Sequence, residues 1–368
     1  MRVLFAGGGT GGHIYPALAL ARYLRRQEKA EVLFVGTERG MEKEIVPQAG
    51  FALETIPVIG LERRLSLRLV RTALLAAKGV REARKILAAF RPDVVVGTGG
   101  YVAGPVVLAA RLARIPTIIH EQNAIPGLTN IWLSRLANRV CLSLAGSEQY
   151  FPRPEKTILT GNPRASEAVQ AAADGSTVLQ PQLAPGRPVL LCVGGSHGAA
   201  KLNEVFSGCL ELILTACEAQ IVYITGPKYY EPIKKQTELI RRRFADRLHI
   251  LPYHRQLPRL LAQTDLVISR AGATTLAEIT AIGVPAVLIP SPNVTNNHQE
   301  YNARIMAEKG AALIIREQEL SVAGLATRLV ELLLNQKRLQ EMARASKALG
   351  MPEAAAKMAK IIYELAHK

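Results

Sequence analysis

The chain has 368 residues, of which 49% are hydrophobic, and it carries a net charge of +16. This length exceeds one typical domain, so two α/β domains with separate apolar cores are expected. No apolar run approaches the roughly 18 residues of a membrane span, and Met1 leads into a strand pattern without a signal peptide. The four cysteines form no CxxC pair, which favours free thiols in a reducing cytoplasm over a metal site.

The first predicted unit is a buried strand, Val3 to Ala6, then the loop G-G-G-T-G-G-H (residues 7–13) and a helix over residues 15–26. The loop satisfies GxGxxG in the strand-to-helix setting of a dinucleotide site. A dinucleotide site also needs an acidic residue about 20 positions further on, at the end of the next strand. Neither candidate fits well, because Glu31 lies at the start of that strand and Glu38 lies well past it. A loop whose backbone admits another phosphate or a sugar is favoured, and a nicotinamide or flavin site is the alternative.

Positive charge is concentrated between Leu61 and Arg91, where nine basic residues stand against Glu62 and Glu82. Apolar residues interleave them, a composition suited to a surface that lies on anionic lipid. A solvated helix face and a nucleic-acid patch are the alternatives, although the lack of an aromatic residue before Phe90 weakens base stacking. The basic residues are Arg63, Arg64, Arg68, Arg71, Lys78, Arg81, Arg84, Lys85 and Arg91.

Two further strand-to-loop units follow. Residues 93–96 lead into a glycine-rich loop that ends at Gly104, and residues 117–119 lead into H-E-Q-N, residues 120–123. In a parallel sheet these loops meet the first one at a single edge, where ligands bind in such folds. The polar residues expected to gather there are His13, Thr98, Tyr101, Glu121 and Asn123.

Residues 161–187 change character and are expected to form an interdomain linker region, rich in alanine, proline and polar residues. Residues 189–193 then restart the pattern with a strand, the loop G-G-S-H-G (residues 194–198) and a helix. This repetition predicts two similar domains that face each other across a cleft.

The loop at 194–198 also matches the nucleophile elbow of hydrolases, with Asp265 and His298 available to complete a triad with Ser196. However, this elbow would open the second domain instead of following several strands. Donation of the Ser196 hydroxyl and N–H to a phosphate oxygen is therefore the favoured interpretation.

The stretch from Asp265 to Asn302 predicts a strand, a tight turn, a helix over residues 273–281 and another strand. The free backbone N–H groups of residues 273–275 would point to the carboxyl edge of the sheet, where anions bind. Glu278 lies one helical turn further on and suits sugar hydroxyls, which donate hydrogen bonds to a carboxylate. The pattern indicates a nucleotide-sugar site, and an ordinary βαβ unit with an exposed glutamate is the alternative.

Two further features bear on the chemistry. Tyr253 and His254 follow a predicted strand, where a ring can cover a planar base. The sequence contains no DxD motif, which disfavours a carboxylate-bound Mg²⁺, so no metal requirement and no other cofactor are expected. The charge of a leaving diphosphate would then be neutralised by helix N–H groups and cations.

In combination the motifs resemble the MurG family of bacterial glycosyltransferases over essentially the whole chain. Members of this family transfer N-acetylglucosamine to undecaprenyl-pyrophosphoryl-N-acetylmuramoyl-pentapeptide. The matching motifs are G-G-G-T-G-G-H (7–13), G-G-Y-V-A-G-P (99–105), H-E-Q-N (120–123), G-N-P-R (161–164), G-G-S-H-G-A (194–199), R-A-G-A-T-T-L-A-E (270–278) and N-H-Q (297–299).

The resemblance implies an α/β GT-B fold, with two Rossmann-like, doubly wound domains separated by a cleft. Residues 1–163 would take the lipid acceptor, 164–187 would link the domains, 188–345 would bind the UDP-sugar and 346–368 would return to the first domain. Another GT-B UDP-sugar transferase acting on a lipid acceptor is the alternative function, followed by a dinucleotide-binding oxidoreductase.

The resemblance also implies roles for single residues. On the donor side, Tyr253 and His254 would hold uracil, Glu278 would bind the ribose, and Gln299 would bind the sugar with Asn302 in support. The diphosphate would be bound by Ser196, Ala273, Thr274 and Thr275. Arg164 and Arg270 would be diphosphate-binding or site-shaping cations, and His298 stands where some members have glutamine. On the acceptor side the residues are Thr10, Gly11, Gly12, His13, Tyr101 and Asn123.

An inverting transfer requires a base for the acceptor hydroxyl, and His13 is the favoured candidate. The partial positive charge at a helix start disfavours imidazolium, so the ring would stay neutral near pH 7. Glu121, from a convergent loop, is the rival base, and acceptor binding or closure of the helix start is the alternative role of His13.

The partners expected from the resemblance are UDP-N-acetylglucosamine, the undecaprenyl-linked muramoyl-pentapeptide and an anionic membrane surface, without nucleic acid. Other cell-wall synthesis proteins are further candidate partners. The expected location is peripheral, at the cytoplasmic face of the cell membrane.

Overall fold

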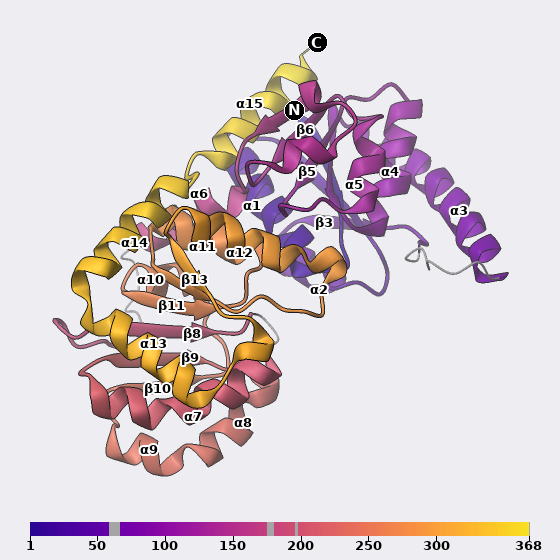
Figure 1. The fold of residues 1–368 in the computed structure, drawn as a ribbon. Coiled ribbons are helices and arrows are strands. Elements are labelled where there is room, and N and C mark those ends of the chain that lie inside the picture. The colour runs from indigo at the N-terminus through magenta and orange to yellow at the C-terminus, as the bar shows by residue number, and fades with distance from the viewer. Residues whose placement is uncertain (59–66, 175–179, 196–197, 368) are drawn as a thin grey trace. The chain divides into compact units, whose positions relative to one another are not determined.

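The computed structural model describes residues 1–58, 67–174, 180–195 and 198–367, with the side chains of residues 67–74 outside that description. Two compact units make up the chain (Figure 1). The first contains residues 1–166 together with 351–368, and the second contains residues 167–350.

Within the described residues of the first unit, seven parallel strands form one sheet in the order β3-β2-β1-β4-β5-β6-β7. Their central strands are continuous apolar runs, because both faces of the sheet are covered by helices. Val3 and Phe5 of β1 face one side and Leu4 and Ala6 the other, and all four are fully buried. The strands are β1 Arg2–Gly7, β2 Glu31–Gly36, β3 Ala52–Thr55, β4 Val94–Gly99, β5 Thr117–Glu121, β6 Arg139–Leu142 and β7 Thr157–Leu159.

Helices α1 and α15 cover one face of this sheet, while α3, α4 and α5 pack on the other. The last helix, yellow in Figure 1, lies along α1 although the two are far apart in sequence. Its apolar side chains at 355, 358, 361, 362 and 365 are buried, so one face of this helix is part of the core of the first unit. The helices are α1 Gly11–Gln27, α2 Glu42–Gln48, α3 Leu67–Phe90, α4 Gly100–Leu112, α5 Leu128–Ser134, α6 Pro163–Ala173 and α15 Ala354–Ala366, with short 3₁₀ turns at Ser147–Tyr150 and Pro154–Lys156.

The second unit repeats the architecture with a parallel sheet ordered β10-β9-β8-β11-β12-β13 over its described residues. Helices α7 and α13 pack on one face, and α10, α11 and α12 pack on the other. The strands are β8 Val189–Val193, β9 Gln220–Ile224, β10 Leu248–Leu251, β11 Leu266–Ser269, β12 Ala286–Leu288 and β13 Ala312–Ile314. The helices are α7 Ala200–Ala216, α8 Pro227–Gln236, α9 Glu238–Arg243, α10 Leu257–Leu261, α11 Ala273–Ile282, α12 His298–Glu308, α13 Val322–Leu334 and α14 Gln336–Leu349, with 3₁₀ turns η3 Thr295–Asn297 and η4 Glu317–Glu319.

Both sheets are therefore doubly wound and Rossmann-like, as the sequence predicts. In each, the strand order reverses direction beside the first strand of the unit, between β1 and β4 and between β8 and β11. The carboxyl ends of these strand pairs are the usual ligand sites of such folds. Residues 8–10 follow β1, and β4 passes directly into α4 at Gly100, so the glycine-rich segment predicted as a loop up to Gly104 is instead the end of a strand and the first turns of a helix. In the second unit, Gly194 and Gly195 follow β8 and residues 270–272 follow β11.

Details differ from the expectations. The helix predicted to begin at residue 15 begins at Gly11, because the loop closes its first turn with backbone bonds to Thr10 O. Helix α6 occupies the beginning of the expected linker, where an alanine-rich run follows Pro163 at the first helical position. The two compact units divide after Ser166 and after Gly350.

Helix α3 contains most of the basic run. In the half whose side chains are described, Ala83 and Leu87 are buried against the sheet side while Lys78, Arg81 and Arg84 are exposed. This half is an ordinary amphipathic helix, whereas Arg63 and Arg64 lie outside the described residues. None of the helices in the described ranges has both the length and the hydropathy needed to cross a bilayer.

Candidate functional site

In the first unit, the loop after β1 and the junction of β4 with α4 approach each other closely. Gly99 and Gly100 have positive φ angles of 110° and 76°. A Cβ at Gly99 would lie 2.9 Å from the His13 ring, and a Cβ at Gly100 would lie 2.6 Å from Gly8 O. Glycine is therefore required at both positions, by backbone conformation and by the lack of space.

His13 lies in the first turn of α1 and is held by its backbone neighbours. Its Nδ1 lies 3.1 Å from Gly8 O and 3.3 Å from Thr10 Oγ1. A carbonyl oxygen can only accept, so this contact places the proton on Nδ1 of a neutral ring. Nε2 is then the basic nitrogen, as proton abstraction by His13 would require.

Glu42, at the start of α2, is buried beneath the same loop. Its Oε2 accepts a hydrogen bond from Gly9 N at 3.0 Å, and its Oε1 accepts from Thr37 N and Thr37 Oγ1 at 2.9 and 2.8 Å. Burial raises the pKa of this carboxyl, but these hydrogen bonds together outweigh burial and hold the pKa below its usual value. An ionised carboxylate thus occupies the space under the glycine-rich loop.

Glu121, the rival base, is also buried and has extensive hydrogen bonding. Its Oε1 accepts from the backbone N–H groups of Gln122 and Asn123, both at 2.9 Å. Its Oε2 accepts from Asn130 Nδ2 at 2.8 Å and Gly127 N at 3.1 Å. These contacts hold the loop after β5 and engage both oxygens of the Glu121 carboxylate.

A buried polar network lies beside Glu121. His120 Nδ1 lies 3.1 Å from Gln122 Nε2, and its Nε2 lies 3.0 Å from Ser143 Oγ. Burial lowers the pKa of His120 to about 4, so the ring is neutral at physiological pH. Within the described ranges, three buried oxygens near this edge have no hydrogen-bond partner: Thr98 Oγ1, Gln122 Oε1 and Asn130 Oδ1.

The remaining acceptor-side predictions lie at the same edge. Tyr101 is 38% exposed and its ring would lie 3.6 Å from a Cβ at Gly9, and the Asn123 amide contacts Glu121. Thr10 and Gly12 are exposed, and Gly11 is partly buried at the start of α1. Arg164, predicted on the donor side, belongs to the first unit, where its guanidinium lies 5.9 Å from the centre of the Tyr15 ring.

In the second unit, the turn after β11 has the features predicted for an anion site. Gly272 precedes the first turn of α11, and Asn302 Nδ2 donates to Ala271 O at 3.1 Å, which fixes the approach to that turn. Asn302 is fully buried, in agreement with a supporting role. Among the described residues, the buried Thr274 Oγ1 is left without a hydrogen-bond partner. Glu278, one turn further on, is 5% exposed and not a surface residue.

Arg270 joins three strand ends at this edge. Its Nη1 donates to Ile289 O at 3.2 Å and Pro290 O at 3.4 Å, just past β12, and its Nη2 pairs with Glu317, just past β13. These contacts favour the site-shaping role over direct diphosphate binding.

The other donor-side predictions are spread along the same edge. Gln299 Oε1 accepts from Ser291 N at 2.9 Å, and His298 Nδ1 donates to Thr295 O at 2.8 Å. Tyr253 is 52% exposed, and His254 Nε2 donates to Gln180 O at 2.7 Å. Ser196 lies outside the described residues.

The hydrolase triad is not formed. Asp265 precedes β11 and accepts from Val189 N at 2.8 Å, at the amino end of the sheet. His298 lies beyond the carboxyl end of β12. Strand length separates the two side chains, so no acid–histidine pair can be completed there.

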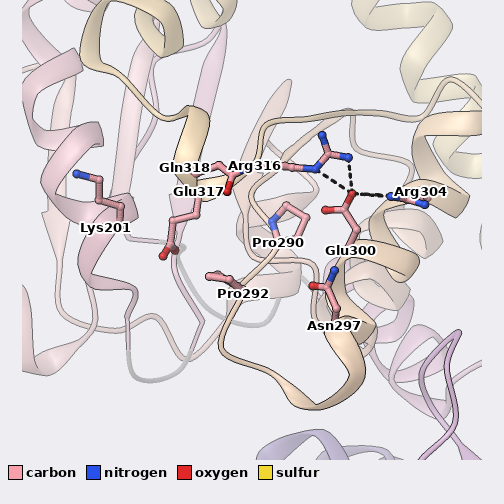
Figure 2. Close-up of a pocket in the computed structure, with 9 residues that line it drawn as sticks. All are labelled: Lys201, Pro290, Pro292, Asn297, Glu300, Arg304, Arg316, Glu317 and Gln318. Atoms are coloured by element: carbon pink, nitrogen blue, oxygen red, sulfur yellow. Dashed lines mark hydrogen bonds and ion pairs between the residues drawn. The ribbon is translucent and has the colours of Figure 1, made fainter.

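A cavity of 550 Å³ opens in the second unit beside the donor-side turn. Figure 2 shows Arg304 and Arg316 converging on Glu300, with distances of 3.2 and 2.8 Å to its Oε1. Glu317, which pairs with Arg270, also lines the cavity. Its charges are nearly balanced, so the cavity does not by itself favour an anionic ligand. The lining residues are Lys201, Pro290, Pro292, Asn297, Glu300, Arg304, Arg316, Glu317 and Gln318.

Comparisons with known proteins identify the family. The glycosyltransferase family 28 N-terminal domain matches residues 3–142, and the glycosyltransferase family 28 C-terminal domain matches residues 189–358. The UDP-N-acetylglucosamine–N-acetylmuramyl-(pentapeptide) pyrophosphoryl-undecaprenol N-acetylglucosamine transferase of Halalkalibacterium halodurans is 44% identical over 368 residues and the full length of both chains. That of Bacillus subtilis is 44% identical over 99% of both chains. The chain belongs to the MurG family of glycosyltransferases.

Solved structures agree with this assignment. The crystal structure of Acinetobacter baumannii MurG aligns with a TM-score of 0.77 and 30% identity over 99% of each chain, so the GT-B fold is confirmed. The UDP-GlcNAc 2-epimerase of Neisseria meningitidis, solved with UDP-GlcNAc, aligns with a TM-score of 0.71 at 14% identity, over 99% of this chain and 100% of its own. That second likeness shows the fold alone.

The sequence motifs of this MurG-family chain do not include several residues that hold the loops at the strand ends. Glu42 follows β2 within an unremarkable polar stretch, and only its burial under the loop reveals its position. The position of Glu317 likewise emerges only from the structure, because the pairing of β12 with β13 brings this residue, just past β13, to Arg270. Glu300 was also not predicted, although the N-H-Q-E-Y-N run places it directly after the predicted Gln299 and could have drawn attention to it.

Proposed function

We propose that this chain transfers N-acetylglucosamine from UDP-N-acetylglucosamine to the muramoyl sugar of undecaprenyl-pyrophosphoryl-N-acetylmuramoyl-pentapeptide. The end-to-end identity of 44% to transferases of that name carries the proposal. The two loop clusters at the strand ends of both units agree with it.

The reaction is a single in-line displacement. The acceptor hydroxyl attacks the anomeric carbon of the sugar, UDP leaves from the opposite side, and the α-linked donor gives a β-linked product. His13 Nε2 takes the proton of the hydroxyl, since Nδ1 is already engaged with the Gly8 carbonyl. Negative charge that develops on the diphosphate is stabilised by helix N–H groups at the start of α11.

The donor assignment is supported by three observations in the second unit. Thr274 Oγ1 is buried beside the α11 start with no partner among the described residues, so a phosphate oxygen would satisfy it. Asn302 fixes the backbone of Ala271. Glu278 is a buried carboxylate one turn along, as ribose hydroxyls require. Uracil binding by Tyr253 and His254 and sugar binding by Gln299 complete the proposed donor site.

Isothermal titration calorimetry tests the assigned class directly. We expect UDP to bind in the micromolar range without added metal, because the proposed diphosphate contacts come from the backbone and side chains alone. NAD and duplex DNA at physiological salt should not bind. Tight binding of NAD, or a strict requirement for Mg²⁺, would contradict the proposal.

The acceptor is anchored in the bilayer by its lipid, so the enzyme must reach the membrane surface. We propose that residues 61–91 bind the anionic cytoplasmic leaflet through their basic side chains. Replacing Arg64, Arg68 and Arg71 together by glutamine should weaken binding to phosphatidylglycerol vesicles by up to about 150-fold and reduce its salt dependence, because each cation contributes up to about 1 kcal/mol near such a surface. Vesicle sedimentation at several salt concentrations measures both effects.

A matched triple variant controls for net charge. Lys235, Arg242 and Arg243 are exposed cations of the second unit, and replacing them by glutamine removes the same charge. Vesicle binding of this control should stay close to that of the native protein. An equal loss of vesicle binding in both triple variants would show that only net charge matters. Unchanged vesicle binding in both would show that residues 61–91 form a solvated surface that does not bind the membrane.

A further inference from the structure

Glu42 and His13 contact the same peptide group. Glu42 Oε2 accepts from Gly9 N at 3.0 Å, and His13 Nδ1 donates to Gly8 O at 3.1 Å. The Gly8 carbonyl and the Gly9 N–H belong to one planar peptide unit, so the carboxylate and the imidazole lie at its two ends. A buried anion and the proposed base are thereby connected through a single rigid, polar group.

Three glycines of this region lie directly against the Glu42 side chain. A Cβ at Gly8 would lie 2.4 Å from Glu42 Oε1, and a Cβ at Gly40 would lie 2.2 Å from the same atom. At Gly36 a Cβ would lie 2.4 Å from Glu42 Cγ. The Glu42 side chain is therefore packed against backbone at all three glycines, and the hydrogen bond from Gly9 N sets the position of its carboxylate relative to the Gly8–Gly9 peptide.

We propose that Glu42 is a positioning residue for His13, which acts through the Gly8–Gly9 peptide to fix the tautomer and raise the basicity of the imidazole. This inference rests on the proposed role of His13 as the base in glycosyl transfer. Glu42 is only 1% exposed, so the proposed role acts through His13 and not through a substrate contact.

The physical basis is polarisation of the peptide. A carboxylate at the N–H end increases the partial negative charge on the carbonyl oxygen at the other end, as in cooperative hydrogen-bond chains. The carbonyl then binds an Nδ1–H more strongly, which keeps Nε2 unprotonated and favours the imidazolium that forms when Nε2 accepts a proton. The arrangement offsets the positive helix start, which disfavours that cation.

Titratable groups of other elements also lie at this edge of the first unit. His120 and Glu121 lie on β5, the former neutral because burial lowers its pKa to about 4 and the latter hydrogen bonded to Asn130. Tyr101 lies near Gly9 on α4, and Arg164 lies over Tyr15 of α1. Glu42 differs from these groups in that the Gly8–Gly9 peptide connects it to the His13 ring.

Nuclear magnetic resonance of the ¹⁵N-histidine-labelled full chain measures the proposed effect without any substrate. In the native protein, His13 should be the Nδ1–H tautomer at high pH. In Glu42→Gln the loss of charge should lower the pKa of His13 by about one unit and mix the tautomers. The acidic limb of the kcat profile should move to lower pH by the same amount, and kcat at its plateau should fall about tenfold.

Thr37→Val is the matched control. It removes the hydroxyl bond to Glu42 Oε1 but keeps the carboxylate and its bond to Gly9 N. Its melting temperature should fall while the tautomer and the pH profile of His13 stay native. If Glu42 only stabilised the loop, both variants would lose stability and neither would change the titration of His13.

Two outcomes overturn the proposal. One is an Nε2–H tautomer of His13 in the native protein, which decides the matter even when Glu42→Gln fails to fold. The other is an unchanged His13 titration in folded Glu42→Gln. Failure of the proposed function can be told apart from failure of this inference, because the native protein would then show no transfer of N-acetylglucosamine, whichever tautomer His13 adopts.

Discussion

His13→Ala should lower kcat by roughly 10²–10⁴-fold while the donor KM stays nearly unchanged, as expected for loss of a general base. The structure supports this because the Gly8 carbonyl commits Nδ1 and leaves Nε2 as the basic nitrogen. The acidic limb of the kcat profile should disappear with the imidazole. Steady-state kinetics between pH 5 and 9, with the donor and the acceptor varied separately, measure all three effects.

Glu121→Ala separates the two candidate bases. This carboxylate accepts hydrogen bonds from the loop N–H groups and from Asn130, so its removal should lower the melting temperature and the acceptor affinity together. The acidic limb should persist in the activity that remains. A His13→Ala enzyme that keeps the acidic limb and changes only the acceptor KM would make His13 a binding residue and place the base elsewhere.

The sequence predicted the sheets well, because both are parallel and buried on two faces. Runs such as Val3 to Ala6 and Val189 to Val193 can only be strands of a covered sheet when glycine-rich turns follow them. The strand-to-helix turns then locate the ligand edges, since topology fixes where the carboxyl ends of parallel strands lie. Helix α11, which follows the turn at Gly272, was predicted over residues 273–281 and ends at Ile282.

The sequence could not rank residues that share one edge. Glu121 ends β5 and His13 lies in the helix after β1, and only the hydrogen bonds show that the Glu121 carboxylate is already engaged by its own loop. Arg270 has the charge expected of a diphosphate ligand, yet two carbonyls and Glu317 surround it. Such contacts depend on side chains distant in sequence, so motif spacing carries no record of them.

Glu278→Ala should raise the donor KM by roughly 30- to 150-fold, which corresponds to about 2–3 kcal/mol for charge-assisted hydrogen bonds to the ribose. The carboxylate is 5% exposed and stands one turn beyond the start of α11, so it can reach a nucleotide whose phosphate binds that start. The ribose contacts persist from ground state to transition state, so kcat should change little. Initial rates at varied UDP-N-acetylglucosamine, with saturating acceptor, measure both constants.

Glu300→Ala provides the control, since Glu300 is an equally buried carboxylate of the same unit. It pairs with Arg304 and Arg316, so its loss should reduce stability without a comparable rise in the donor KM. Calorimetry with UDP should show the same contrast in the absence of acceptor, because the ribose is common to both ligands. An unchanged donor KM in Glu278→Ala would remove this residue from the nucleotide site, and an equal rise in Glu300→Ala would attribute the effect to general loss of a buried charge.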